Sequence, residues 1–327
     1  MKVLYVSSGR GEDYQCDLLF HGLRELLGTH AVDVGRIVSL YEQPDELKHA
    51  LYGRGYTVYA NLPEVEIDRS GIVAKIQATY FDSVIYGSIR RCSDYLPQVL
   101  KHYPPSRVAF IDGEDDTRLK WSLLGKGTYF KRELLQPLAP FVQPIHFAAP
   151  AKKFVSDPAF EENLTRKRRV FAPCDPRDRS TYVFNTEPAY YQQYQESYFG
   201  ITMRKAGWDC MRHHEIVAQG TAPYFLGLED CPRWTIHKLP RPLLMELREL
   251  VDHEKQMASP TTRARYSELM RKLFDFYKRN FTTVALAEHV LGVLASSAVL
   301  DRSRKSPWLL QSRRLLNAYR YGKAVLP

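Results

Sequence analysis

Short apolar runs alternate with amphipathic stretches along the first half of the chain. Strands are predicted at residues 2–8, 31–38, 81–89 and 107–111, with a weaker one at 145–148. Helices are predicted at residues 14–28, 71–80 and 94–103. In the first helix five leucines between Leu18 and Leu27 lie on one side, and Gly28 is placed to cap its end. This alternation of strand and helix predicts a parallel, doubly wound sheet.

The second half repeats the rhythm after a polar stretch. Residues 149–168, which contain two prolines and lead into a run of four basic residues, are predicted to be a linker. Strands are predicted at residues 170–172, 198–203, 222–228 and 234–237, and helices at residues 209–219, 243–253 and throughout 262–299. A chain of 327 residues is also longer than one domain usually is, so two α/β domains are expected.

Charge and cysteine usage narrow the class of protein. Residues 1–150 carry 17 Lys and Arg against 18 Asp and Glu, a net charge of −1, so the second half carries +10 and the chain as a whole +9. That half is expected to attract anions such as nucleotide diphosphates, nucleic acid or lipid headgroups. The five cysteines are scattered without a CxxC pair, which predicts neither a disulfide framework nor a zinc site and favours a reducing cytoplasm. Neither a signal peptide nor a membrane span is expected from the pattern.

Ligands of doubly wound sheets bind outside the carboxyl ends of the strands, and three predicted loops lie there. Their sequences are SSGRGED at 7–13, GSIRRCSD at 87–94 and DGEDD at 112–116. Position makes them the best functional candidates of the first half.

Residues 198–240 carry the most informative pattern. A strand is followed by a basic turn, an Arg-x-x-Glu pair on a helix (Arg212 and Glu215), Gly220, and a strand that ends in the acidic Glu229–Asp230 loop. This segment resembles the donor-binding half of GT-B glycosyltransferases and, more narrowly, the CgeB-type (spore-maturation glycosyltransferase-like) family. The resemblance implies two Rossmann-like domains facing a cleft, with a helical C-terminal segment. Residues 1–150 would form the acceptor side, residues 151–300 the donor side, and residues 301–327 a basic helix packing back on the first domain.

A nucleotide-sugar donor, with a UDP-sugar as the first candidate, explains the chemistry of this segment. A helix N-terminus with nearby cations suits a diphosphate, and a helix carboxylate can accept both ribose hydroxyls. Gly220 keeps the next turn slim, and only one of the adjacent His213 and His214 can reach the same ligand, because their directions differ by about 100°. The residues expected at the donor are Arg204, Lys205, Arg212, His213, Glu215 and Gly220.

Inverting transfer also needs a general base, which the first domain of a GT-B enzyme is expected to supply. Four carboxylates are candidates, with the first one leading: Asp13, Asp112, Glu114 and Asp115. The acceptor is expected at the loops that contain Gly9, Arg10, Gly11, Ser88 and Arg90. The pattern leaves inversion and retention open.

Several alternatives stay open. Many GT-B enzymes carry a second glutamate eight positions after the first, but Pro223 stands there, so a non-catalytic nucleotide or glycan binder is an alternative. No cofactor or metal is expected, although DGEDD leaves Mg²⁺ as a second possibility. Residues 301–327, with seven basic residues and one acid, also suit anionic membrane or nucleic acid, including an enzyme that glycosylates modified DNA bases.

Overall fold

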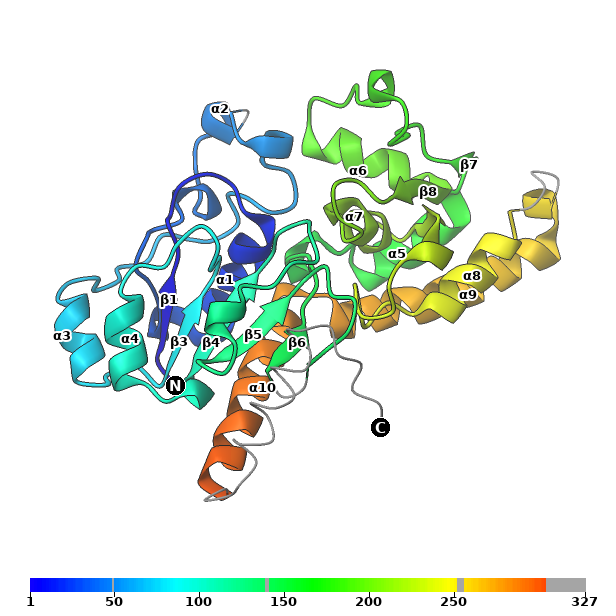
Figure 1. Ribbon diagram of the computed structural model, residues 1–327. Helices are drawn as coiled ribbons and strands as arrows, with labels where there is room; N and C mark the ends of the chain where they lie inside the picture. Colours follow the sequence, from blue (N-terminus) through cyan, green and yellow to red (C-terminus); the bar gives the residue numbers. More distant parts are fainter. Residues whose placement is uncertain (49, 139–140, 252–255, 304–327) are drawn as a thin grey trace, which may run out of the picture.

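Two parallel sheets organise the chain in the computed structural model, which describes residues 1–48, 50–138, 141–251 and 256–303 (Figure 1). The first sheet has six strands in the order β2-β1-β3-β4-β5-β6, and the second has three in the order β7-β8-β9. All the pairings within them are parallel. The order β2-β1-β3 reverses direction at β1, which places a topological switch point beside the end of that strand.

The strands of the first sheet are short and almost entirely buried. They are β1 (Val3–Val6), β2 (Ala31–Asp33), β3 (Ser83–Tyr86), β4 (Val108–Asp112), β5 (Thr128–Lys131) and β6 (Val142–Pro144). The helices that accompany them are α1 (Tyr14–Leu27), α2 (Asp45–Lys48), α3 (Ile72–Gln77) and α4 (Leu96–His102). Short 3₁₀ turns lie at Gly28–His30, Val38–Leu40, Tyr52–Gly55, Pro105–Arg107 and Trp121–Leu123.

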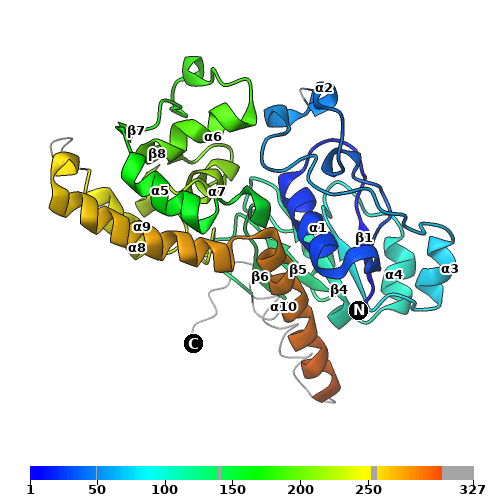
Figure 2. The same ribbon diagram turned by 180° about the vertical axis from the view of Figure 1, so that it is seen from behind.

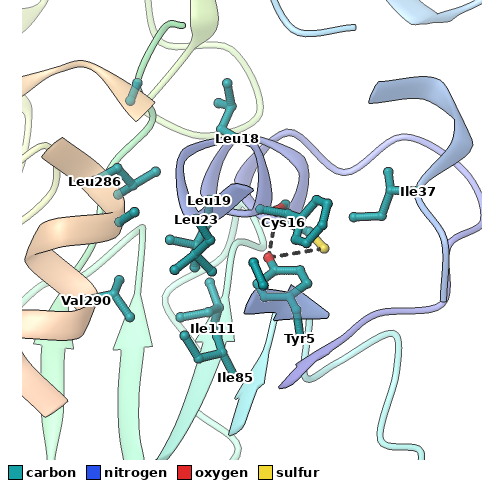
Figure 3. Close-up of a cluster of buried hydrophobic side chains, with 14 of the residues drawn as sticks. Tyr5, Cys16, Leu18, Leu19, Leu23, Ile37, Ile85, Ile111, Leu286 and Val290 are labelled. Atoms are coloured by element: carbon teal, nitrogen blue, oxygen red, sulfur yellow. Dashed lines mark hydrogen bonds between the residues drawn. The ribbon is translucent and has the colours of Figure 1, made fainter. Parts of the chain in front are cut away.

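Alternate residues of these strands face two different helical layers. Tyr5, Ile85 and Ile111 pack toward α1, where the Tyr5 hydroxyl donates to the carbonyl of Cys16 at 2.6 Å (Figure 3). Their neighbours, among them Leu4 and Val84, belong to a separate buried cluster that includes residues of α3 and α4. Both faces are therefore apolar, as a doubly wound sheet requires.

The second domain is smaller and mostly helical. Its strands are β7 (Arg169–Phe171), β8 (Ser197–Met203) and β9 (Ala222–Leu226). Its helices are α5 (Asp157–Arg166), α6 (Glu187–Gln195), α7 (Met211–Ala218), α8 (Arg241–Glu249) and α9 (Pro260–Asn280). Short 3₁₀ turns lie at Ala151–Lys153, Arg179–Thr181, Leu228–Asp230 and Gln256–Ala258.

The chain then returns to the first domain. Helix α10 (Thr283–Ser303) leaves the end of α9 and packs against α1, so the last described helix completes the core of the first domain (Figure 2). Leu286 and Val290 of α10 meet Leu19 and Leu23 of α1 in that core (Figure 3). The expected fold class, two α/β domains with a helical C-terminal segment, is confirmed. Most of the predicted basic helix, residues 304–327, lies outside the described residues.

Several predicted elements are wrong in detail. Residues 145–148 are not a strand, because β6 ends at Pro144, and the pattern gave no sign of β5. Residues 234–237 form a turn in which Ile236 has φ +49°, a value that a strand does not allow. The predicted linker contains α5. The helical pattern predicted over 262–299 is present, divided into α9 and α10 at Phe281 and Thr282. Within the described residues, no helix is long and apolar enough to cross a membrane.

Candidate functional site

A cavity of about 980 Å³ lies between the two domains, and we call it the interdomain cavity. Residues that follow β1, β4 and β5 line its first-domain side, among them Asp13, Asp115 and Arg132. Residues that follow β7 and β8, together with α7, line the other side. The carboxyl ends of both sheets therefore meet at this cavity, which is where a doubly wound protein binds its ligand.

The N-terminus of α7 opens onto the cavity without a side-chain cap. Cys210 precedes the helix and makes no capping hydrogen bond through its side chain, and Cys210, Met211 and Arg212 all line the cavity. The first backbone N–H groups of a helix have no partner within it, and the helix dipole makes this end positive. This end of α7 is therefore suited to bind an anion.

Three cations of the second domain line the same cavity: Arg179, Lys205 and Arg212. Lys205 donates to the carbonyl of Pro176 at 2.6 Å, and Arg212 donates to the hydroxyl of Tyr182. Within the described part of the chain, none of the three forms a salt bridge with a carboxylate. Their charges are not neutralised by direct pairing, so this side of the cavity attracts negative groups.

Glu215 is the buried carboxylate beside these cations. Its Oε1 accepts from the hydroxyl of Thr57 at 2.9 Å, and its Oε2 accepts from the hydroxyl of Tyr190 at 2.7 Å. Burial raises the pKa of Glu215, while those two hydrogen bonds and the charge of Arg212 act to lower it. Each carboxylate oxygen has two lone pairs, so Glu215 retains acceptor capacity for a ligand in the cavity that it lines.

The first domain contributes acidic groups to the opposite side. Asp13 is the N-cap of α1, where its Oδ1 accepts from the N–H of Cys16 at 3.2 Å, and its Oδ2 lies 3.4 Å from Nε of Arg91. Asp115 instead pairs with the buried guanidinium of Arg132, which also donates to the carbonyl of Asp209 at 2.7 Å. The first-domain carboxylates that line the cavity are thus paired with arginines of their own domain, Asp13 with Arg91 and Asp115 with Arg132.

Several predicted residues lie away from the cavity lining. Asp112 is buried and is held by Arg90 at 2.8 Å and by Lys131 at 2.9 Å, which makes it the centre of a buried ion cluster. Glu114 pairs with Arg91 at 2.9 Å. The five residues that were expected at the acceptor also lie outside the cavity lining: Gly9, Arg10, Gly11, Ser88 and Arg90.

On the second domain, some of the predicted donor residues line the cavity and others lie outside it. His213 is fully buried, with Nδ1 2.8 Å from the hydroxyl of Thr202 and Nε2 2.8 Å from the carbonyl of Trp208. The guanidinium of Arg204 lies over the ring of Trp208, outside the cavity lining. Gly220, at φ +72°, packs against Phe160 behind the helix. Lys205, Arg212 and Glu215 are the predicted donor residues that the fold brings together.

Other lining residues were not predicted. Arg132 directly follows β5, and recognition of that strand would have placed it at a carboxyl end. Tyr182, Phe184 and Tyr190 add an aromatic wall, for which the tyrosine-rich stretch at 190–197 was the only signal. Residues 53–56 come from a connection between β2 and α3 that no local pattern marks as functional.

No protein-family model matches the chain, and no curated protein matches it. Solved structures similar to it include HepE of Anabaena in complex with UDP-glucose, at 10% identity, with 90% of this chain and 100% of that chain covered and a TM-score of 0.43. Another is an α-glucosyltransferase in complex with UDP and a 13-mer DNA containing a HMU base (10% identity, 90% and 99% covered, TM-score 0.42). A third is MurG of Acinetobacter baumannii (12% identity, 90% and 99% covered, TM-score 0.38).

Proposed function

We propose that this protein is a glycosyltransferase that takes a sugar from a nucleotide-sugar, with a UDP-sugar as the first candidate. One observation carries the proposal: the N-terminus of α7, which has no side-chain cap, the carboxylate of Glu215 and three cations that form no salt bridge with the described residues all line one cavity. A nucleotide diphosphate requires this combination, because its phosphates need positive charge and N–H donors while its ribose needs an acceptor. The resemblance of residues 198–240 to the CgeB-type family agrees with this assignment.

In the proposed complex, Lys205, Arg212 and Arg179 bind the diphosphate. Glu215 accepts hydrogen bonds from the ribose hydroxyls. As the sugar leaves, negative charge develops on the diphosphate, and the three cations and the dipole of α7 stabilise that charge in place. We therefore propose transfer without a metal ion, in the cytoplasm that the scattered cysteines favour.

The acceptor would bind on the first-domain side, with Asp13 as its base. In an inverting transfer the acceptor oxygen attacks the anomeric carbon, its proton passes to the carboxylate of Asp13, and the nucleoside diphosphate departs with the electrons of the broken bond. Asp13 suits this role better than Asp115, because Asp115 is paired with the buried guanidinium of Arg132, whereas Asp13 is paired at 3.4 Å with the half-exposed Arg91.

Substitution of Arg212 tests the donor site. Arg212→Ala removes a cation next to the helix N-terminus, and hydrogen bonds to a charged group contribute about 1.5–3 kcal/mol, so nucleotide affinity should fall about 10- to 100-fold. The measurement is a thermal-shift screen against UDP-, GDP-, CMP- and TDP-sugars, with and without magnesium, followed by calorimetry with the nucleotide that binds.

Arg204→Ala is the matched control. Arg204 is a basic residue that directly follows β8, but its guanidinium lies over the ring of Trp208 outside the cavity lining, so its loss should change affinity less than about threefold. Stabilisation by none of the nucleotides, or equal affinity of Arg212→Ala and the wild type, would reject the proposed donor site.

A further inference from the structure

The connection between β2 and α3 crosses to the second domain. Its residues 54–57 contact α6, α7 and the loop before α6. Arg54 donates to the side-chain oxygen of Asn185, and the ring of Tyr56 stacks on that of Tyr190, with centroids 5.7 Å apart. The first domain therefore reaches the part of the second domain that surrounds Glu215.

Thr57 makes the central contacts of this crossing. Its backbone N–H donates to Oε1 of Glu187 at 3.1 Å, and its hydroxyl donates to Oε1 of Glu215 at 2.9 Å. The hydroxyl of Tyr191 lies 2.5 Å from the same Thr57 oxygen, so a chain of hydrogen bonds runs from Tyr191 through Thr57 to Glu215. Both hydrogen-bond donors of Thr57, its backbone N–H and its hydroxyl, thus donate to residues of the other domain.

The backbone of Thr57 is strained at this point. Its φ is +64°, a left-handed value that a β-branched residue rarely adopts and that costs on the order of 1–3 kcal/mol. Thr57 is also completely buried. Such a conformation persists where the surroundings determine it, and here the determining contacts are those to Glu187, Tyr191 and Glu215.

Thr57 approaches Glu215 without blocking it. Glu215 and Tyr190 line the interdomain cavity, whereas Thr57 does not. The hydroxyl of Thr57 therefore fixes one oxygen of Glu215 and the hydroxyl of Tyr190 fixes the other. The remaining lone pairs of the carboxylate are available to a ligand.

We propose that Thr57 is a positioning residue through which the first domain orients the nucleotide-binding carboxylate of the second. The inference rests on the proposed function. Its physical basis is that the Thr57 hydroxyl, reaching over from the first domain, fixes one oxygen of Glu215 and leaves that carboxylate facing the cavity, where it can accept from a ligand.

Thr57→Val is the first test. Valine keeps the β-branched shape and the same backbone strain but replaces the hydroxyl with a methyl group. Binding of UDP, or of the nucleoside diphosphate that the screen selects, is measured by calorimetry between pH 5.5 and 8. The affinity should fall about tenfold, which corresponds to the net contribution of one hydrogen bond to a charged group. Thr57→Ser, which keeps the hydroxyl, should stay within about twofold of the wild type.

The pH profile separates positioning from a merely structural role. The hydrogen bond from Thr57 lowers the pKa of Glu215, so its loss should raise that pKa and move the acid limb of nucleotide binding to higher pH. The other titratable groups that interact with Glu215 are unchanged in the variant: Cys174, Glu187, Tyr190, Tyr191, Tyr194 and Arg212. A change in stability alone would leave this limb where it is.

Thr235→Val is a matched control, because Thr235 is also buried and its hydroxyl also crosses between the domains, to the carbonyl of Leu134 at 3.1 Å. It lies away from Glu215, and Thr235→Val should lower the melting temperature without changing nucleotide affinity or its pH profile.

Thr57→Ala, which lacks both the hydroxyl and the branched carbon, repeats the test if the valine variant does not fold. A wild type that binds no nucleotide would remove the proposed function and this inference with it. A wild type that binds, with unchanged affinity and pH profile in Thr57→Val and Thr57→Ala, would overturn this inference alone.

Discussion

Asp13 and Asp115 line the same cavity but differ in what already binds them, and this difference assigns their roles. Asp13→Asn should lower the rate of UDP release from the UDP-sugar donor in the presence of acceptor at least 100-fold, because general-base catalysis contributes about 10²–10⁴. Donor affinity and stability should stay close to wild type, since asparagine caps a helix about as well as aspartate does and Asp13 caps α1. Asp115→Asn is the comparison. Loss of turnover in Asp115→Asn but not in Asp13→Asn would reverse the assignment.

For single residues, the sequence predicts which side chains share one face of a helix, because the helix period determines this. Residues 212 and 215 are three apart on one helix, so their side chains lie on one face, and both line the cavity. His213 was expected at the donor but is buried in the core, because its side chain points about 100° away from that of Arg212. The direction of Arg204 was not predictable, because it depends on Trp208, whose placement is set by tertiary packing.

Helices α1 and α10 pack closely, and a glycine in each of them predicts an opposite effect of substitution by alanine. A Cβ on Gly22 of α1 would lie 1.8 Å from the carbonyl oxygen of Thr283, so Gly22→Ala should destabilise the protein by about 1–3 kcal/mol or more. Gly292 is exposed within α10 and has nothing within 4 Å of such a Cβ, so Gly292→Ala should stabilise it by about 0.5–1 kcal/mol. Urea unfolding measures both. Equal effects of the two substitutions would show that α10 does not pack on α1 as described.

Two elements, α5 and β5, were not predicted from the sequence, and each failure has a local physical reason. Pro158 suggested a linker, yet it lies in the first turn of α5, where a proline costs no hydrogen bond, and Ser156 caps that helix by accepting from the N–H of Ala159. Strand β5 is four residues long, and its buried Lys131 interrupts the apolar pattern. That lysine is paired with Asp112, a partner that only the folded sheet supplies.

In the molecule as a whole, three histidines from separate segments of the chain lie together with their rings tilted against one another. His146 follows β6, His237 follows β9 and His289 belongs to α10. The ring centroids of His146 and His237 lie 5.3 Å apart, as do those of His237 and His289. Burial lowers the pKa of all three, to about 3 for His237. The cluster is therefore neutral at pH 7, and its protonation is coupled to folding, which buries the three rings.

This coupling predicts an acid-sensitive fold. In the unfolded chain the three histidines titrate near pH 6.5, above their folded pKa values, so below that pH the unfolded state binds more protons and stability falls. Each histidine should contribute a slope of up to about 1.4 kcal/mol per pH unit between pH 6.5 and 5, measured as the free energy of urea unfolding. His146→Phe removes one of these groups and should reduce the slope by up to about 1.4 kcal/mol per pH unit, the contribution of one proton, whatever it does to stability at pH 7. His30→Gln, at an exposed position, should leave the slope unchanged, and identical slopes in all three proteins would contradict the role of the cluster.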